Sequence, residues 1–129
     1  MTSAVYTPLV ECGGVADDRA QAYDRRWLVV HEDGRWMTRT HFPQLADVTV
    51  ELRLGYLVIR APGMLRLDIP LDVIEDDESV RFTAMVGDQE IDVVDEGELA
   101  TAWMSSYLRQ PCGIMKVHPD VAEVRWSQG

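Results

Sequence analysis

Two cysteines and three histidines are the side chains in this chain with the widest chemical range. Cys12 and Cys112 are 100 positions apart and match neither a Cys-x-x-Cys redox motif nor a zinc spacing. We therefore expect two free thiols in a reducing compartment. No histidine or lysine adjoins either cysteine to lower its pKa, so a small buried side chain is favoured over a sulfur-handling thiol at Cys12.

The histidines do not point to a metal site. His31, His41 and His118, even combined with Asp33 or Asp120, follow no known ligand spacing. No serine stands in a Gly-x-Ser-x-Gly elbow, so the sequence offers no catalytic triad. We predict neither a metal ligand nor a catalytic residue, and no catalytic activity for the chain alone.

Acidic residues are concentrated late in the chain. The run Glu75–Glu78 lacks the alternating ligands and central glycine of a calcium loop, so a solvated connection between strands is the simpler interpretation. An acidic face that binds a protein partner is the alternative. It would combine that run with Asp88, Glu90, Asp92, Asp95, Glu96 and Glu98.

Charge and length limit the classes of function. The 129 residues carry a net charge of -10, and residues 67–129 hold the whole imbalance, with fourteen acids against four bases. We expect one domain that binds neither nucleic acid nor anionic lipid. The sequence has no apolar run long enough to span a membrane and no signal peptide at its start, so we expect a cytoplasmic protein.

Short apolar segments separated by turn residues predict an antiparallel β-structure. Val48–Leu54 alternates apolar and polar residues, which is typical of a strand with one buried face. Asp33-Gly34 and Gly87-Asp88 are hairpin signals, and Pro43-Gln44-Leu45 predicts a single turn. The expected strands are Ser3–Leu9, Arg26–His31, Trp36–Thr40, Val48–Leu54, Tyr56–Ala61, Leu65–Ile69, Val80–Val86, Gln89–Val94 and Gly113–Val117.

One helix is expected late in the chain. Asp95 is its predicted N-cap, with Glu98 as capping-box partner, and Pro111 ends it. The predicted buried face consists of Leu99, Ala102, Trp103, Ser106 and Tyr107. Trp27, Trp36 and Trp103 are expected in the core, whereas Trp126 lies in the tail, where an exposed ring would indicate a partner or tail docking.

These elements predict a mainly β fold, an antiparallel β-barrel of short strands with one C-terminal helix. The barrel domain is expected over residues 1–117. Residues 118–129 are expected to form a C-terminal tail, whose order or disorder the sequence leaves open.

Several short motifs occur in an order that resembles the N-terminal β-barrel domain of MOSC proteins, such as the mitochondrial amidoxime-reducing component. The resemblance extends over about residues 3–117, and the order and spacing of the motifs carry it. The matching stretches are Pro8–Gly14, Tyr23–Val30, Asp33–Arg39, Pro43–Leu45, Leu57–Pro70 and Tyr107–Pro111.

The resemblance implies one cofactor-binding residue. Arg25 matches the family arginine that helps to hold the phosphate of the molybdenum cofactor, a role that suits a planar guanidinium. The alternative is that Arg25 pairs with Asp24 or another nearby carboxylate. The family lysine and serine are replaced by Val10 and Glu11, which removes a cation and adds an anion. No cofactor is therefore expected in the isolated chain.

Two hypotheses for function follow. In family members this domain precedes a MOSC domain, which this chain lacks, so the resemblance implies a stand-alone, non-catalytic binding or accessory module. The alternative is an accessory subunit of a separate MOSC-type molybdenum enzyme, to whose cofactor-phosphate or substrate site Arg25 contributes.

Overall fold

A computed structural model describes residues 5–71, 81–118, 121, 124 and 126 of this protein. Within those residues it contains strands, two short 3-10 helices and one α-helix. No helix in the described residues is long and apolar enough to cross a membrane. The elements are η1 Asp18–Tyr23, β1 Trp27–His31, η2 Pro43–Asp47, β2 Thr49–Arg53, β3 Tyr56–Arg60, β4 Leu67–Pro70, β5 Arg81–Val86, β6 Gln89–Asp95, α1 Glu98–Leu108 and β7 Cys112–Val117.

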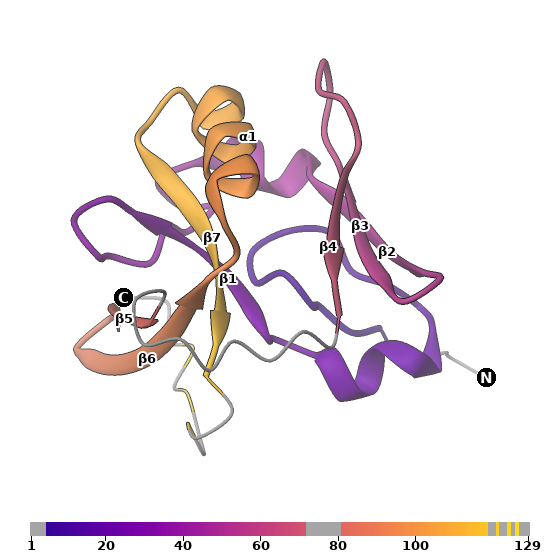
Figure 1. Ribbon diagram of the computed structural model, residues 1–129, viewed down its shortest axis with the longest axis horizontal. Helices are drawn as coiled ribbons and strands as arrows, with labels where there is room; N and C mark the ends of the chain where they lie inside the picture. The colour runs from indigo at the N-terminus through magenta and orange to yellow at the C-terminus, as the bar shows by residue number, and fades with distance from the viewer. Residues whose placement is uncertain (1–4, 72–80, 119–120, 122–123, 125, 127–129) are drawn as a thin grey trace.

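The strands form two antiparallel sheets, one of order β1-β7-β6-β5 and one of order β2-β3-β4. Figure 1 shows the two sheets side by side, with α1 near the end of β7 where that strand begins. The predicted mainly β architecture with one late helix is confirmed.

The larger core lies between the two sheets and under α1. Strand β2 turns Val50 and Leu52 inward, and strand β3 turns Leu57 and Ile59 inward. In β2 these residues alternate with polar residues, which is the period of two expected for Val48–Leu54, so the hydrophobic effect selects this register. The β2–β3 turn uses Gly55 at φ 83°, a conformation in which a side chain is strained.

A second core lies inside the four-stranded sheet. This sheet curls so that residues 34–37 connect its two edge strands, β1 and β5. Residues 34–37 bond to β1 on one side, where Met37 N–H donates to Val29 O at 2.8 Å. On the other side Trp36 N–H donates to Met85 O of β5 at 2.9 Å. The segment therefore closes the sheet into a small barrel. Its interior holds Leu28, Val30, Ala84, Val86, Ile91, Val93 and Val117.

Two expected strands are wrong. Trp36–Thr40 is not a strand, because Trp36 bonds to Met85 of β5 and Met37 bonds to Val29 of β1. Its only bridge joins Trp36 to Val30, and the bridge to Met85 comes from Arg35, before the predicted strand. Ser3–Leu9, of which residues 3 and 4 lie outside the described part, makes only isolated bridges at Tyr6 and Leu9. Val80, the expected first residue of β5, is also outside it.

Helix α1 starts later than predicted and buries a different face. Its N-cap is Gly97, at φ 112°, and Asp95 instead ends β6, where its Oδ1 accepts the Gly97 N–H at 2.9 Å. Leu99 is 74% exposed, so the predicted face is wrong by about one position. The residues that α1 buries are Ala100, Trp103, Met104 and Leu108.

Close contact between α1 and β7 depends on Gly113. A Cβ at this position would lie 2.8 Å from Thr101 Oγ1, and a β-branched side chain has little freedom to move away. We expect Gly113→Ala to lower the free energy of unfolding by about 1–2 kcal/mol through overpacking, measured by urea denaturation. Adding Thr101→Ala should restore most of this loss; an additive double variant would contradict the contact.

Candidate functional site

Arg25 stands at a strained, exposed corner before β1. Its φ is 55°, and its N–H donates to Thr7 O at 2.9 Å. The Asp24 carboxylate does not pair with it, because Asp24 Oδ1 accepts the Thr7 N–H at 2.7 Å. Among the described residues no carboxylate lies within ion-pair distance of the Arg25 guanidinium. The guanidinium is therefore available to an anion from outside.

The neighbouring segment is held by Arg39, an arginine for which the sequence predicted no role. Glu11 is 9% exposed with φ 74°. Its Oε1 accepts the Arg39 N–H at 3.1 Å, and the Arg39 guanidinium donates to the carbonyl oxygens of Glu11 and Cys12 at 2.8 and 3.2 Å. The Glu11 carboxylate is thus turned toward Arg39. The sequence signal that could have indicated this role is Arg39 itself, the last residue of the stretch Asp33–Arg39 that matches the family.

Both thiols are buried. Burial raises the pKa of Cys12 to about 12, with the Arg39 charge acting weakly in the opposite direction. Burial also raises the pKa of Cys112 to about 11, although the Ser105 hydroxyl lowers it somewhat. Ser105 Oγ donates to Cys112 O at 2.7 Å and accepts the Cys112 N–H at 3.1 Å. Both side chains favour the protonated form, which is a poor nucleophile.

We expect both cysteines to react slowly with iodoacetamide. At pH 8 the raised pKa values lower the thiolate fraction about 100-fold or more, and burial blocks access. The pKa values of both thiols are higher in the native protein than in the unfolded chain, so the protonated thiols contribute to the stability of the fold. This contribution is complete below about pH 9 and is lost as the pH rises toward 11. Mass spectrometry should show fast labelling only in guanidinium; fast native labelling would contradict the burial.

The histidines lie in separate places. His31 Nδ1 is 3.3 Å from Asp33 Oδ1, and His41 Nδ1 lies 3.3 Å from the Thr38 hydroxyl. Nowhere in the described residues do three or more metal-binding side chains come together. Neither histidine pair amounts to a site.

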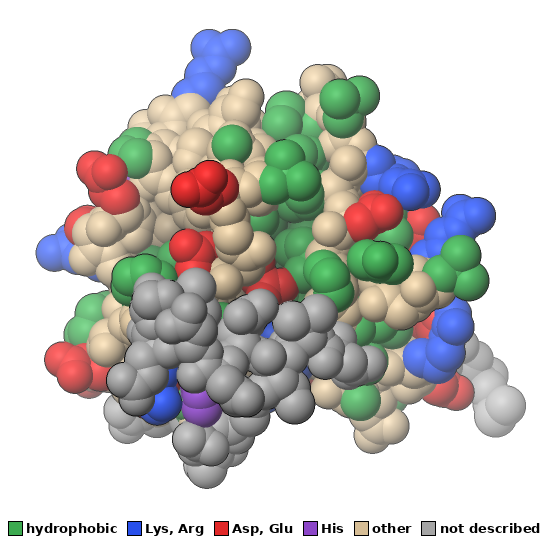
Figure 2. All heavy atoms as spheres, in the orientation of Figure 1, with side chains coloured by type: hydrophobic (Ala, Val, Ile, Leu, Met, Phe, Trp, Pro, Cys, Tyr) green, Lys and Arg blue, Asp and Glu red, His purple; other side chains and the backbone are tan. Residues whose placement is uncertain are grey.

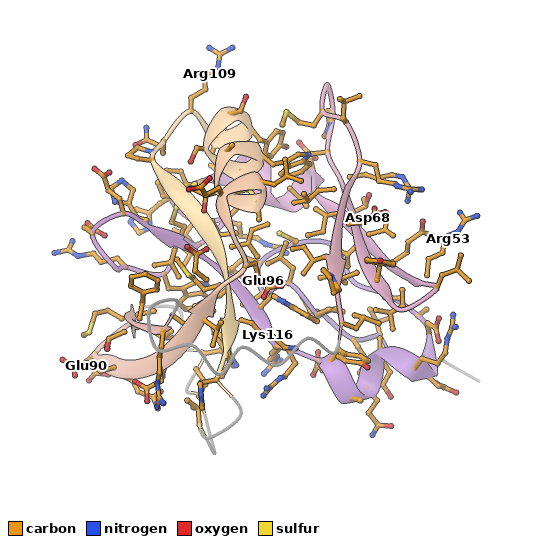
Figure 3. The ribbon with its side chains drawn as sticks, viewed as in Figure 1. Arg53, Asp68, Glu90, Glu96, Arg109 and Lys116 are labelled. Atoms are coloured by element: carbon orange, nitrogen blue, oxygen red, sulfur yellow. The ribbon has the colours of Figure 1, made fainter. Side chains whose placement is uncertain are left out.

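The acidic residues that the structure describes do not all lie on one face. The run Glu75–Glu78 lies outside the described residues. Asp92 pairs with Arg81 at 2.6 Å, while Glu96 turns inward and its Oε2 accepts the Trp27 Nε1–H at 3.2 Å. Figure 3 shows Glu96 between the two sheets and Glu90 at the far end of β6. Only part of the predicted acidic set is therefore available on one surface.

The tryptophans divide between the two cores. Trp27 and Trp103 are buried in the larger core, as predicted. Trp36 packs against the small barrel, and the Trp126 ring lies edge-on to it with centroids 5.2 Å apart. Trp126 is thus docked on the barrel.

A cleft of about 480 Å³ opens at the end of the small barrel next to α1; we call it the barrel mouth. Strands β1, β5, β6 and β7, the turn after β1 and helix α1 contribute to it. Its apolar part includes Phe82, which is 47% exposed, and Met115. The polar lining residues are Glu32, Asp33, Asp95, Thr83, Thr101, Ser105, His31 and Cys112. A cleft of this size can hold a small molecule.

The two curled sheets and the helix define a small antiparallel β-barrel domain. The chain belongs to the family of MOSC N-terminal beta barrel domains, whose model matches residues 7–111. It is similar to a protein of Bordetella bronchiseptica whose solution structure is known, with 60% identity and a TM-score of 0.84. That match covers 98% of this chain and 97% of the other.

Two larger proteins share the domain. Human molybdenum cofactor sulfurase is 29% identical over 96 residues, which cover 73% of this chain and 11% of that protein. Mitochondrial amidoxime reducing component 2 of Bos taurus is 31% identical over 112 residues, which cover 79% of this chain and 33% of that protein. The chain thus spans a third or less of the length of these two relatives.

Proposed function

We propose that this chain is a non-catalytic binding module that works as a stand-alone domain. The observation that carries the proposal is the barrel mouth, an open cleft whose lining consists of apolar, hydroxyl and carboxylate groups. Two reduced thiols suit the cytoplasm, which is the compartment that we propose.

The chemistry of the cleft supports binding rather than catalysis. A covalent mechanism needs an activated nucleophile, but burial holds Cys112, the thiol of the lining, in its protonated form. Ser105 is committed to the backbone of Cys112. Hydrogen-bonding and apolar groups remain, which can recognise a ligand and leave it unchanged.

An NMR titration tests this proposal. A mixed set of small cationic, neutral and anionic compounds is added to ¹⁵N-labelled protein, and amide shifts are recorded. We expect saturable shifts at the barrel mouth, around Gly34, Asp95 and Gly113, with every compound recovered intact. Chemical conversion of a compound, or the absence of shifts from the whole set, would contradict a non-catalytic binding module.

A second candidate is an accessory subunit of a separate MOSC-type molybdenum enzyme. The observation that favours it is the exposed guanidinium of Arg25, which no carboxylate of the described residues compensates. The names of the relatives also connect the family with the molybdenum cofactor. The fit to the cofactor phosphate is incomplete, because Val10 is buried and supplies no charge and the Glu11 carboxylate turns to Arg39. Of the described residues Val10, Glu11 and Arg25, only Arg25 thus offers that phosphate a positive charge.

Inorganic phosphate is the probe for this second candidate. If the candidate is correct, phosphate shifts the amides of Thr7 and Arg25, and Arg25→Ala abolishes the shift. Arg53→Ala, which removes another exposed guanidinium, is the matched control and should leave the shift unchanged. Unmoved amides around Arg25 would remove the basis of this candidate.

A further inference from the structure

The barrel mouth has a mixed apolar and acidic character that indicates a class of ligand. Strand register places its parts: Phe82 lies opposite Val93, and Asp95 lies opposite Met115. Phe82 and Asp95 therefore project from the same side of the sheet, the side that forms the barrel interior. These two side chains lie at the end of the barrel interior that is nearest to α1, where the barrel is open.

The apolar part of the mouth is exposed to solvent. Phe82 shares its side of β5 with Ala84 and Val86, which are buried inside the barrel, yet almost half of the Phe82 side chain is accessible. Leaving a ring exposed at the end of an apolar interior costs free energy that a ligand would recover. The ring face also offers an electron-rich surface to a cation.

The polar part of the mouth is negative. Among its described lining residues there are three carboxylates and no lysine or arginine. The His31 imidazole also lines it, with Nδ1 3.3 Å from Asp33 Oδ1. Asp95 uses Oδ1 to accept the Gly97 N–H. Asp33 lies 3.9 Å from Arg35, whose side chain is 82% exposed and outside the mouth. Because the Arg35 charge is largely solvated, it screens Asp33 only in part.

Hydroxyl groups also line the mouth, although that of Ser105 is bonded to the backbone of Cys112. Thr101 lies above Gly113, whose missing side chain leaves the space that Thr101 occupies. Thr83 and Ser105 also line the mouth. An ammonium group has three N–H donors and no acceptor, so it can bond to a carboxylate and to hydroxyl oxygens together.

We propose that the barrel mouth binds a small organic amine that carries an apolar body. The apolar body lies against Phe82 and Met115, and the ammonium group faces Asp95 and the hydroxyl of Thr101. This inference rests on the proposed binding function and names the class of its ligand. The cleft volume suits a compact molecule rather than an extended chain.

Three probes of similar shape and different charge test the amine. They are 2-phenylethylamine as the cation, 2-phenylethanol as the neutral analogue and 3-phenylpropanoate as the anion. Titration into ¹⁵N-labelled protein should give saturable shifts at the mouth with the amine. We expect the alcohol to bind about five-fold or more weakly, equivalent to losing one exposed charge interaction, and the anion not to bind.

Variants of the full chain locate the site. Asp95→Asn keeps the oxygen that accepts the Gly97 N–H and removes the charge, so we expect about five-fold weaker amine binding. Phe82→Ala should weaken binding of the amine and of the alcohol. Glu90→Gln makes the same change of net charge at the far end of β6 (Figure 3) and should leave binding within about two-fold of the parent.

Equal binding of alcohol and amine, or unchanged binding by Asp95→Asn, would overturn the assignment of an amine. If the alcohol or the anion moves the mouth amides and the amine does not, the cation inference fails while the binding module stands. If neither these probes nor the mixed compound set moves any amide at the mouth, the proposed function fails as well. The spectrum of each variant shows separately whether it is folded.

Discussion

Arg39→Ala lowers the free energy of unfolding by about 2 kcal/mol. The substitution removes the donors from the carbonyl oxygens of Glu11 and Cys12, and it takes away the cation 3.9 Å from the buried Glu11 carboxylate. A fully buried broken ion pair costs about 3–5 kcal/mol. The Arg39 side chain is 47% exposed, so water replaces part of what is lost and the smaller figure applies. Urea denaturation measures the change.

Two further variants separate charge from geometry. Glu11→Gln keeps an oxygen for the Arg39 N–H and should cost about 1 kcal/mol or less. Arg35→Ala is the matched control, because Arg35 is 82% exposed and its nearest carboxylate oxygen is 3.9 Å away; it should change stability by about 0.5 kcal/mol at most. If Arg35→Ala and Arg39→Ala have equal effects, Arg39 does not hold the segment.

The same contacts matter for the second candidate function. The Arg39 guanidinium lies 3.9 Å from the Glu11 carboxylate and partly neutralises its charge. The Arg39 N–H also donates to that carboxylate. Figure 2 shows that the largest group of basic side chains on the visible face lies instead at the right edge of the molecule, beside the three-stranded sheet. Figure 3 labels Arg53 at this edge. Arg60 of β3 and Arg66, which precedes β4, pair with Glu51 and Asp68. Arg25 has no such carboxylate among the described residues and therefore differs from Arg60 and Arg66.

Local patterns made much of the fold predictable. Strand β2 follows from alternation, and the β5–β6 hairpin follows from Gly87, which takes φ 63° at the turn. Each of these features depends on residues that are close in sequence, so the hydrophobic pattern and turn chemistry determine them. The family resemblance is confirmed by the match over residues 7–111.

Features that depend on distant residues were not predictable in the same way. Trp36 begins a segment that looks like a strand, but Trp36 bridges Val30 and bonds to Met85, which belong to different strands. Asp95 resembles a helix cap, yet pairing with Met115 keeps it in β6. The barrel mouth combines residues from both halves of the chain, and no local pattern indicates that they meet.

Trp27→Ala has the largest stability effect that we predict, a loss of about 4 kcal/mol. Trp27 is fully buried at the start of β1, opposite Lys116 of β7. Its ring stacks on Tyr23 with centroids 6.1 Å apart and lies 5.3 Å from Lys116 Nζ. Removing it creates a cavity in the larger core and also takes the indole donor from Glu96. Circular dichroism during urea denaturation measures the loss.

Trp27→Phe separates the cavity from the hydrogen bond. Phenylalanine fills most of the space but has no N–H, so Glu96 loses this donor and the cost should be about 2 kcal/mol. Trp126→Ala is the matched control for losing an indole, because Trp126 is only partly buried and packs on the small barrel rather than in the larger core. If Trp126→Ala destabilises as much as Trp27→Ala, the larger core does not dominate stability. The docking of Trp126 on Trp36 would then be as important as the packing between the two sheets.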